Sequence, residues 1–369
     1  MAFIKKLCPM FCLVFACGIL CAETPAEKEL KKYQAVQNRA DRLYKGLNVK
    51  RDVVYKKFRG KDVTMDLILP AKKVFEGGAP VFVNIHGGGW NGGDRYHVGG
   101  DWARKMNDMG IAVATISYTF AEEGKTDISN CIIDCKDAMR FLAKNAKKFG
   151  INADKIIVSG HSAGGHLSLM TALAPNDMFA GDESLKKYEP HFIGVIARAP
   201  AASFMNPEHD YPGTVSYGSY CFARLVGGSQ TQIDALKKIK NENAYEYLKR
   251  QNPEDPRVKL AELASPVKYL SSDSCPILIF HGDKDNLVSY KTSRYMADLA
   301  KKIGARVAYV EVANADHGLG PAPLPKELAE KNPGQKFYDR ISVDKDSQGK
   351  ISDMFILSAI FDSLKSPQK

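Results

Sequence analysis

The stretch KIIVSGHSAGGHLSLM, residues 155–170, places one serine, Ser162, among glycines directly after an apolar run. The run IIV predicts a buried strand that ends just before the serine. The pattern G-x-S-x-G is typical of a sharp strand-to-helix turn, in which strained backbone angles lift the serine hydroxyl clear of the sheet. Gly160 and Gly164 are small enough to let strand and helix approach without a clash. We therefore interpret Ser162 as a nucleophile, and the alternative is a glycine-rich turn with an incidental serine.

A second glycine-rich motif, HGGGW at 86–90, follows a predicted strand and lies upstream of the serine. Gly88 and Gly89 have no Cβ, so their backbone N–H groups can point into one spot. The N–H of Ala163, at the start of the predicted helix, supplies another donor. A lone HGGG also fits a phosphate nest or a turn, but the two motifs together favour an oxyanion hole.

A serine hydroxyl needs a base to take its proton, and the base needs an acid to orient it. In this type of turn the partners follow in the order serine, acid, histidine. Of the eight histidines, only His317, in NADHGLG, comes late enough to be the base. Asp283 and Asp285, in HGDKDNLV, both qualify as the acid, and we prefer Asp285 because it lies further into the loop. Asp283 is then a turn-forming residue, and Asp316 is a neighbour of the base without a role of its own.

Strand-like runs alternate with helical patterns along the chain. Several runs are almost continuously hydrophobic, which is typical of strands buried on both faces of a parallel sheet. The alternation predicts an α/β fold with a mainly parallel, doubly wound sheet. The earliest pieces have no helix between them, so we expect them to form an antiparallel hairpin. The predicted strands are 51–58, 63–69, 80–86, 111–119, 154–160, 193–200, 276–282 and 306–313.

No linker divides the chain, so we expect one domain over residues 23–369, with two departures from the strand–helix rhythm. Residues 201–262 form an aromatic-rich, lid-like insertion, whose rings either stack on substrate or pack a lid core. Residues 319–369 form an extra C-terminal segment that ends in a helix. Within it, DKDSQGKIS (344–352) opens like a calcium loop, from Asp344, Asp346, Gln348 and Gly349 to Ser352. Phe355 stands where a bidentate Glu is needed, so we expect a turn.

The first 22 residues have the pattern of a signal peptide: Lys5 and Lys6, then an apolar run, then a small residue. We place cleavage after Ala22 and expect a secreted or periplasmic protein. The apolar run is short and contains a proline, which makes a stable membrane span a poor interpretation. The alternative is cleavage at Cys17 with attachment of a lipid anchor, although the bulky Phe15 argues against it.

The net charge and the absence of ligand motifs exclude some classes of binding partner. The chain has 369 residues, a net charge of +10 and scattered lysines, without the aromatic-interleaved basic motif of a nucleic-acid binder. No metal-ligand spacing is present, and we expect neither a metal nor a cofactor. Four of the eight cysteines lie in the signal segment. We expect Cys131 and Cys135 in the core, and export would allow a Cys221–Cys275 disulfide, whose pairing the sequence does not assign.

Taken together, HGGGW, GHSAGG, HGDKDNLV and ADHG resemble the α/β-hydrolase esterases of the hormone-sensitive-lipase-like and bacterial feruloyl/acetylxylan-esterase (BD-FAE-like) groups. The resemblance covers roughly residues 50–318. It implies an eight-stranded sheet, the triad Ser162, Asp285 and His317, and an oxyanion hole of three backbone N–H groups. The long insertion and the C-terminal segment depart from the family pattern, so family substrate preferences carry over poorly.

The expected activity is therefore that of a serine carboxylic-ester hydrolase without a cofactor. Export favours a small ester or an esterified carbohydrate, carrying acetyl or feruloyl groups, as the substrate. Trp90 and His161, beside the two glycine motifs, are candidates for contact with substrate. A peptidase or amidase, or a short-chain lipase, would use the same triad. A non-catalytic binding protein on this fold is the alternative from another class, and the sequence does not indicate the oligomeric state.

Overall fold

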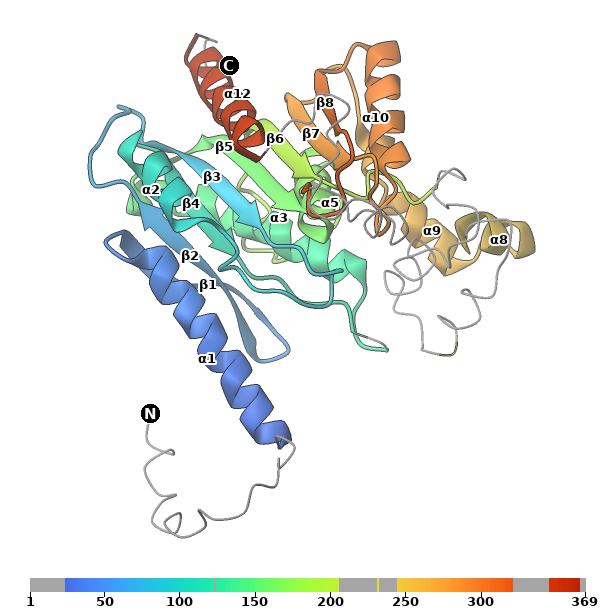
Figure 1. Cartoon of the computed structure of the whole chain (residues 1–369), viewed down its shortest axis with the longest axis horizontal. Helices are drawn as coiled ribbons and strands as arrows, with labels where there is room; N and C mark the ends of the chain where they lie inside the picture. The colour runs from blue at the N-terminus through green and yellow to red at the C-terminus, as the bar shows by residue number, and fades with distance from the viewer. Residues whose placement is uncertain (1–23, 123, 206–230, 232–243, 321–344, 366–369) are drawn as a thin grey trace, which may run out of the picture.

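The computed structural model describes residues 24–122, 124–205, 231, 244–320 and 345–365 (Figure 1). The predicted signal peptide, most of the insertion, Cys221 and Asp344 lie outside these residues. The helices and strands keep the numbering of Figure 1. They are α1 (Pro25–Tyr44), β1 (Asn48–Phe58), β2 (Lys61–Leu69), β3 (Ala79–Ile85), α2 (Gly100–Asp108), β4 (Ala112–Ile116), α3 (Ile128–Lys144), α4 (Ala146–Phe149), β5 (Ile151–His161), α5 (Ala163–Leu173), β6 (Phe192–Arg198), α8 (Ala244–Gln251), α9 (Pro256–Leu263), the 3₁₀ turn η2 (Pro266–Tyr269), β7 (Ile277–Gly282), α10 (Tyr290–Ile303), β8 (Val307–Val312) and α12 (Lys345–Lys365).

The strands form one eight-stranded sheet in the order β1-β2-β4-β3-β5-β6-β7-β8. The pairs β1–β2 and β2–β4 are antiparallel, which confirms the predicted entry hairpin. The remaining neighbours, from β4 to β8, pair in parallel. This is the sheet of an α/β-hydrolase, as the sequence predicted.

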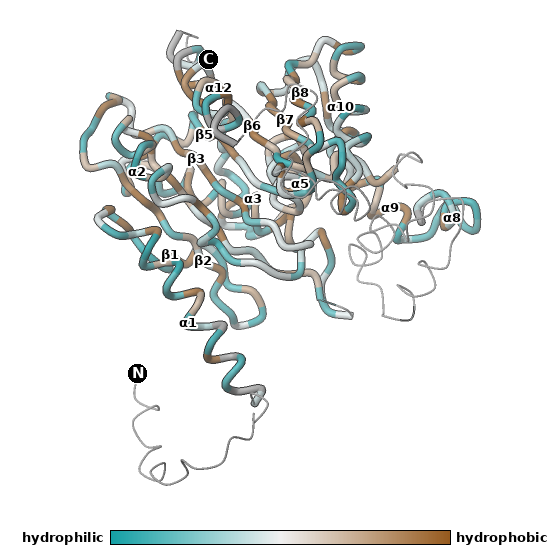
Figure 2. The backbone as a smooth tube through the Cα atoms, in the orientation of Figure 1, coloured by the Kyte–Doolittle hydropathy of each residue, from teal (hydrophilic) through white to brown (hydrophobic). Residues whose placement is uncertain are grey.

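Helices cover both faces of the sheet, and the alternation of strand side chains divides the core into two layers. Helices α3, α5 and α10 pack on one face, over residues such as Val83, Ile85 and Val158. Helices α1, α2 and α12 pack on the other face, over residues such as Phe82, Ile157 and Phe280. Figure 2 shows the hydrophobic strands in the interior and hydrophilic residues along the outer helices.

Burial on both faces explains the continuous hydrophobic runs. Every residue of β4 and of β7 is buried, so neither strand has a polar, solvent-facing side. Burying one Val, Leu or Ile side chain contributes roughly 1.5–3 kcal/mol, so these central strands supply much of the stability that holds the site rigid. Cys131 and Cys135 are fully buried in α3, as predicted.

The strand register brings three chain segments to the same edge of the sheet. Ile116 of β4 pairs with Ile85 of β3, and Ile85 pairs with Gly160 of β5. The next residues on β3 and β5 are His86, which begins the HGGGW motif, and His161, which precedes Ser162. Parallel strands therefore deliver both glycine-rich motifs side by side at their carboxyl ends, where ligands bind in open α/β sheets.

Two elements differ from the sequence-based expectations. Helix α1 was not predicted; its capping box, formed by Thr24 and Glu27, begins a helix whose last turn buries Ala40, Leu43 and Tyr44. The turn predicted over 344–352 is wrong, because Lys345–Lys365 is one continuous helix. Contacts with distant segments of the chain hold this helix in place.

The contacts that hold the start of α12 come from two distant segments. Arg198 donates to Ser352 Oγ over 3.0 Å, and Gln348 Nε2 donates to the carbonyl of Leu319 over 3.2 Å. These tertiary bonds outweigh the local turn preference of Gly349, which costs a helix only about 1 kcal/mol. The predicted closing helix is confirmed and begins earlier than expected. Among the helices of the described residues, none is both long and apolar enough to cross a membrane.

Candidate active site

Ser162 occupies a strained turn between β5 and α5. Its backbone has φ 58° and ψ −123°, a conformation that side-chain-bearing residues rarely adopt, and its N–H donates to the carbonyl of Arg198 over 2.8 Å. A Cβ on Gly160 would lie 2.4 Å from the backbone of Gly164, and a Cβ on Gly164 would lie 2.0 Å from the carbonyl of Ile85. The two glycines are therefore required for the close approach that lifts Ser162 above the sheet, as the motif predicted.

The HGGGW loop packs directly against this turn. A Cβ on Gly87 would lie 3.5 Å from the Cβ of Ser162. Gly88 and Gly89 adopt positive φ values of 120° and 60°, which suit residues without a Cβ. Within the described residues, the N–H groups of Gly88, Gly89 and Ala163 have no hydrogen-bond acceptor. Unpaired backbone N–H groups in the HGGGW loop and at the start of α5 are the kind of donors from which an oxyanion hole is built.

Trp90 holds the loop in place from the core side. Its side chain is only 2% exposed, and Nε1 donates to Nδ1 of His166 over 3.2 Å. His166 in turn donates from Nε2 to the carbonyl of Ala264 over 2.7 Å, a tautomer that follows from these two partners. Burial lowers the pKa of His166 to about 4, so the ring stays neutral. The indole of Trp90 thus ties the HGGGW loop to α5, and its contact with substrate stays a prediction.

The acid and the base lie in two loops that follow β7 and β8. His317 Nδ1 and Asp285 Oδ2 are 2.7 Å apart. Asp285 is completely buried, whereas the His317 side chain is 16% exposed. Because Nδ1 of His317 faces the carboxylate, Nε2 is the nitrogen left to accept a proton. This is the orientation that a general base needs.

Asp285 accepts four hydrogen bonds. Besides His317, its Oδ2 accepts from Nε2 of His281 over 3.1 Å. Its Oδ1 accepts from the backbone N–H groups of Leu287 and Val288, each over 2.9 Å. Burial opposes the charge of Asp285, but the hydrogen bonds from His281 and His317 outweigh it, so the pKa of this carboxyl lies below its usual range. Asp285 is therefore an anion throughout the physiological range.

His281 is a part of the site that sequence reasoning set aside. It precedes the acid in the chain, so it was excluded as the base, and the structure gives it a different place. Its Nδ1 accepts from Ser293 Oγ over 2.8 Å, and its Nε2 is also 3.0 Å from the carbonyl of Val288. Held on both sides, the ring fixes the carboxylate of Asp285. The signal available in the sequence was its spacing, four residues before the acid.

His161 contacts the base loop. Its Nε2 donates to the carbonyl of His317 over 2.6 Å, and the two rings lie 4.7 Å apart. Burial lowers the pKa of His161, so the ring is neutral and Nε2 carries the proton. The sequence proposed His161 as a contact for substrate; the structure commits its Nε2 to His317, which joins the nucleophile turn to the loop of the base.

Close packing also brings the His317 loop to β7. A Cβ on Gly282 would lie 2.3 Å from the carbonyl of Ala315, so only glycine fits at the end of this strand. The N–H of Lys284 donates to the same carbonyl over 2.9 Å. Within the described residues, Ser162 Oγ forms no capping hydrogen bond with the start of α5.

The two other acids considered from the sequence lie elsewhere. Asp283 donates its N–H to the carbonyl of Val312 over 3.1 Å, and its Oδ1 is buried without a partner among the described residues. Asp316 accepts from the N–H of Gly318 over 2.8 Å and shapes the turn that carries His317. The structure thus brings Asp285, and neither of these, to Nδ1 of the base.

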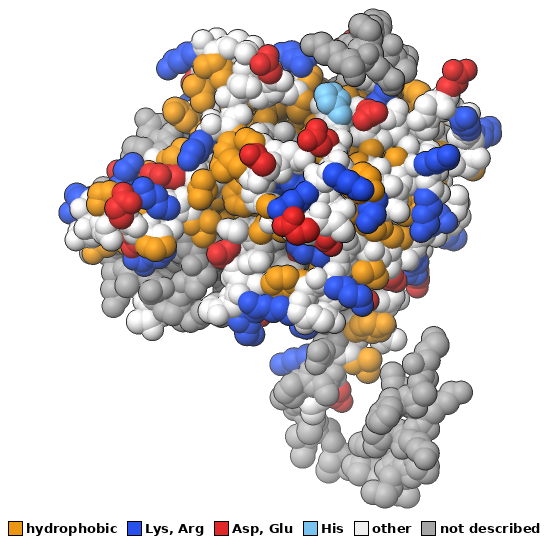
Figure 3. Space-filling view, turned by 180° about the vertical axis from the view of Figure 1, so that it is seen from behind, with side chains coloured by type: hydrophobic (Ala, Val, Ile, Leu, Met, Phe, Trp, Pro, Cys, Tyr) orange, Lys and Arg blue, Asp and Glu red, His pale blue; other side chains and the backbone are white. Residues whose placement is uncertain are grey.

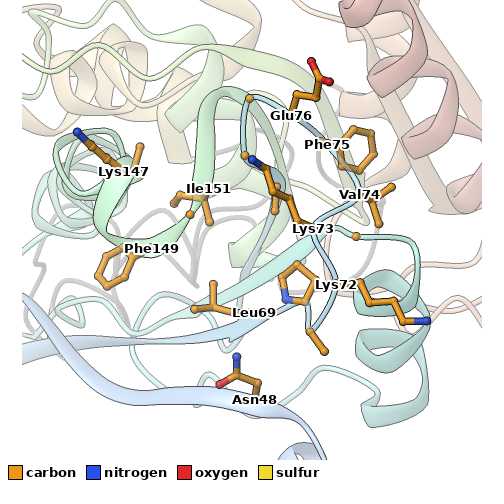
Figure 4. A pocket seen from close by; sticks show the side chains of 18 residues that line it. Asn48, Leu69, Lys72, Lys73, Val74, Phe75, Glu76, Lys147, Phe149 and Ile151 are labelled. Atoms are coloured by element: carbon orange, nitrogen blue, oxygen red, sulfur yellow. The ribbon is translucent and has the colours of Figure 1, made fainter.

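Other surfaces are separate from this site. A cavity of about 560 Å³, which includes Leu69, Phe149 and Ile151 in its lining (Figure 4), opens at the amino ends of the parallel strands, away from Ser162. On the face seen in Figure 3, lysines and arginines are interspersed with acids and form no single basic patch. Within the described residues, no group of three His, Cys, Asp or Glu side chains is arranged to hold a metal ion.

The chain is similar in sequence to one protein family and to known ester hydrolases. The BD-FAE family model matches residues 65–299, which include both glycine-rich motifs and the acid. The chain is 26% identical over 282 residues to the probable carboxylic ester hydrolase LipM of Mycobacterium tuberculosis, covering 75% of this chain and 58% of LipM. It is 25% identical to the esterase LipQ of the same organism, covering 65% of this chain and 50% of LipQ. The chain thus spans about half the length of these relatives.

Solved structures share the fold. A truncated carbohydrate esterase from gut microbiota aligns with a TM-score of 0.61 at 20% identity, covering 85% of this chain and 96% of that one. A Thermogutta terrifontis esterase aligns with a TM-score of 0.58 at 23% identity, covering 85% of this chain and 92% of that one. These similarities show a common architecture around the site.

Proposed function

The chain belongs to the BD-FAE family, and from this premise we propose that it is an exported serine carboxylesterase that removes acyl groups from carbohydrates. The observation that carries the proposal is the 2.7 Å contact between His317 and Asp285, at the edge of the sheet that presents Ser162. The ester hydrolases among its relatives and the carbohydrate esterase among its structural neighbours support the same activity.

The first half of the reaction acylates the serine. Nε2 of His317 takes the proton of Ser162 Oγ as the oxygen attacks the ester carbonyl. The carbonyl oxygen becomes an oxyanion, which accepts hydrogen bonds from the N–H groups of Gly88, Gly89 and Ala163. His317 then gives its proton to the leaving alcohol, and an acyl-serine remains. Asp285 stabilises the imidazolium during the transfer and keeps Nδ1 protonated.

The second half returns the enzyme to its starting state. A water molecule gives a proton to His317 and attacks the acyl carbonyl, and the same N–H groups hold the second oxyanion. The bond to Ser162 breaks, the serine recovers its proton, and the carboxylic acid leaves. Every proton is carried by the chain's own imidazole, so this sequence of steps needs no cofactor.

Export and the nature of the acyl group are part of this proposal. The basic, apolar and small-residue order of residues 1–22 supports delivery to an extracytoplasmic compartment, where esterified polysaccharides are available. Acetyl and feruloyl groups are the acyl groups that we propose. We expect the protein in the exported fraction to begin near residue 23 and to be accessible to added trypsin. Retention of the full-length chain in the cytoplasm would contradict export.

The activity is tested with p-nitrophenyl acetate, methyl ferulate and acetylated xylan, alongside an aminoacyl arylamide. We expect ester cleavage that exceeds amide cleavage by orders of magnitude, and the Ser162→Ala variant should lose at least about 10³-fold in kcat while keeping its Tm. Full activity of this variant, or preferred cleavage of the arylamide, would overturn the proposal.

A further inference from the structure

The segment that follows the HGGGW motif, residues 91–96, folds back onto the HGGGW loop. A Cβ on Gly88 would lie 2.2 Å from the carbonyl oxygen of Gly92, and a Cβ on Gly93 would lie 2.3 Å from that of Gly87. The two backbones are therefore in direct contact. Because packed backbones transmit displacements, a movement of this segment would move the N–H groups that are proposed to hold the oxyanion.

Arg95 ties the 91–96 segment to the sheet. Its side chain is only 9% exposed, and Nη1 donates to the hydroxyl of Thr64 over 3.0 Å and to that of Ser117 over 3.1 Å. Thr64 belongs to β2 and Ser117 follows β4, so one guanidinium joins two strands. Its Nη2 pairs with Asp52, and its Nε lies 3.0 Å from Oδ2 of Asp66, which is completely buried. Breaking such a buried pair leaves an uncompensated charge, which holds the guanidinium in place.

Helix α1 supports the same segment from a second side. The hydroxyl of Tyr44 donates to the carboxylate oxygen that Arg95 faces, and its ring meets that of Tyr96 edge-on at 5.9 Å. Burial, and then the charge of this carboxylate, raise the pKa of Tyr44, so the hydroxyl remains a donor. Arg39 of α1 pairs with Asp94. Three neighbouring residues that follow the HGGGW motif are therefore fixed by β2, by β4 and by α1.

We propose that Arg95 is a positioning residue of the active site, and that α1 completes the support which Arg95 gives to the HGGGW loop. This proposal rests on the proposed function, because it concerns the N–H donors of Gly88 and Gly89. Arg95 acts through the backbones of Gly92 and Gly93 rather than on the substrate. Preorganised donors favour the transition state over the bound ester, so a loosened loop lowers kcat and leaves KM almost unchanged.

The variant Arg95→Lys tests this support while it retains the positive charge. A lysine can still pair with Asp66, but its compact ammonium group cannot reproduce the fork that also serves Thr64 and Ser117. We expect kcat for p-nitrophenyl acetate to fall about tenfold at nearly constant KM, which is less than the roughly 10²–10³-fold loss caused by removal of one oxyanion donor.

The matched control is Arg140→Lys. Arg140 of α3 is also buried and also pairs with a buried aspartate, Asp137, at 2.9 Å. Its hydrogen bonds among the described residues go to Asp137 and Asn176, and not to the HGGGW loop. The control should lose a similar few degrees of Tm and keep its kcat. A normal kcat in Arg95→Lys, or equal losses of kcat in the two variants, would overturn the proposal.

A milder variant tests the part that α1 plays. Tyr44→Phe removes one hydroxyl and keeps the ring that meets Tyr96, so we expect it to fold even if Arg95→Lys does not. The loss of one hydrogen bond in the support should lower kcat about threefold at constant KM. An unchanged kcat in Tyr44→Phe would refute the contribution of α1.

Hydrogen exchange separates this proposal from the proposed esterase activity, because it needs no catalysis. The N–H of Asn91 donates to the carbonyl of Gly88 over 3.2 Å and so reports whether the two segments stay together. In peptides that contain Asn91, this amide should exchange about fivefold faster in Arg95→Lys and in Tyr44→Phe than in wild type, and Arg140→Lys should match wild type.

The two measurements have distinct outcomes. Faster exchange in a protein whose wild type cleaves no ester would refute the esterase and keep Arg95 as the support of this loop. Exchange as slow as in wild type in both variants would overturn the proposal, whatever the activity.

Discussion

Replacing Asp285 with asparagine should abolish most of the activity by changing the tautomer of the base. Oδ1 of Asp285 accepts from two backbone N–H groups, so an asparagine would keep its oxygen there and turn its NH₂ toward the histidines. That NH₂ would face Nδ1 of His317, where the carboxylate now accepts at 2.7 Å. His317 would then carry its proton on Nε2 and could not accept one from Ser162. We expect kcat to fall about 10⁴-fold.

The same substitution should also destabilise the protein, because the N–H of His281 loses one of its two acceptors. A cost of about 1–3 kcal/mol in the free energy of unfolding is expected at neutral pH. The folded-state pKa of Asp285 is lowered, so its stabilisation is present above its unfolded pKa of about 3.9 and is lost as the pH falls below that value. The difference between wild type and variant should therefore shrink below about pH 4.

Initial rates with p-nitrophenyl acetate and denaturant titrations measure the two effects separately. Asp283→Asn is the matched control, since Asp283 is two residues away and makes no contact with His317 among the described residues. We expect it to keep kcat within a few-fold. An Asp285→Asn variant with near-normal kcat, or a larger loss in Asp283→Asn, would refute this assignment of the acid.

Three further predictions follow from single contacts. His161→Phe should lower kcat about tenfold with little change in KM, because the 2.6 Å hydrogen bond to the carbonyl of His317 is lost. His161→Gln should restore much of the rate. Equal rates in the two variants would show that this hydrogen bond does not affect catalysis. Tyr118→Phe should lower kcat/KM several-fold, because the carbonyl of His86 loses its hydrogen bond from the Tyr118 hydroxyl. Unchanged kinetics would show that this hydrogen bond does not support the HGGGW loop. Burial lowers the pKa of Lys136 to about 7, so the stability of wild type relative to Lys136→Met should rise by about 1.4 kcal/mol per pH unit between pH 7 and 10; a flat difference would contradict it.

The sequence predicted the parts of the site that depend on local chemistry and chain order. The serine turn needs glycines at fixed spacing, and the base has only one eligible histidine, so both could be named. The mainly parallel sheet follows from hydrophobic patterns, because burial on both faces leaves continuous apolar runs, and the antiparallel hairpin follows from the absence of a helical pattern between the first two strands. The order of the strands in the sheet was not predicted.

Other parts depend on contacts between distant segments, which no pattern records. Trp90 is 76 residues from His166, and its place in a motif says nothing about the direction of its side chain. His281 supports the acid through a ring orientation that Ser293 fixes. The helix α12 replaces the expected turn, and one of its residues, Ser352, accepts a hydrogen bond from Arg198, 154 residues away. In each case tertiary packing decides between local alternatives that the sequence leaves open.

The central claim is that Ser162 is a nucleophile activated by His317, and covalent labelling tests it most directly. Wild-type protein treated with a fluorophosphonate should gain the mass of one phosphonyl group, located by peptide mass spectrometry on Ser162 in GHSAGG. The His317→Ala variant should label far more slowly although it stays folded. Labelling at another residue, no labelling of the folded wild type, or equal rates in the two proteins would contradict the account.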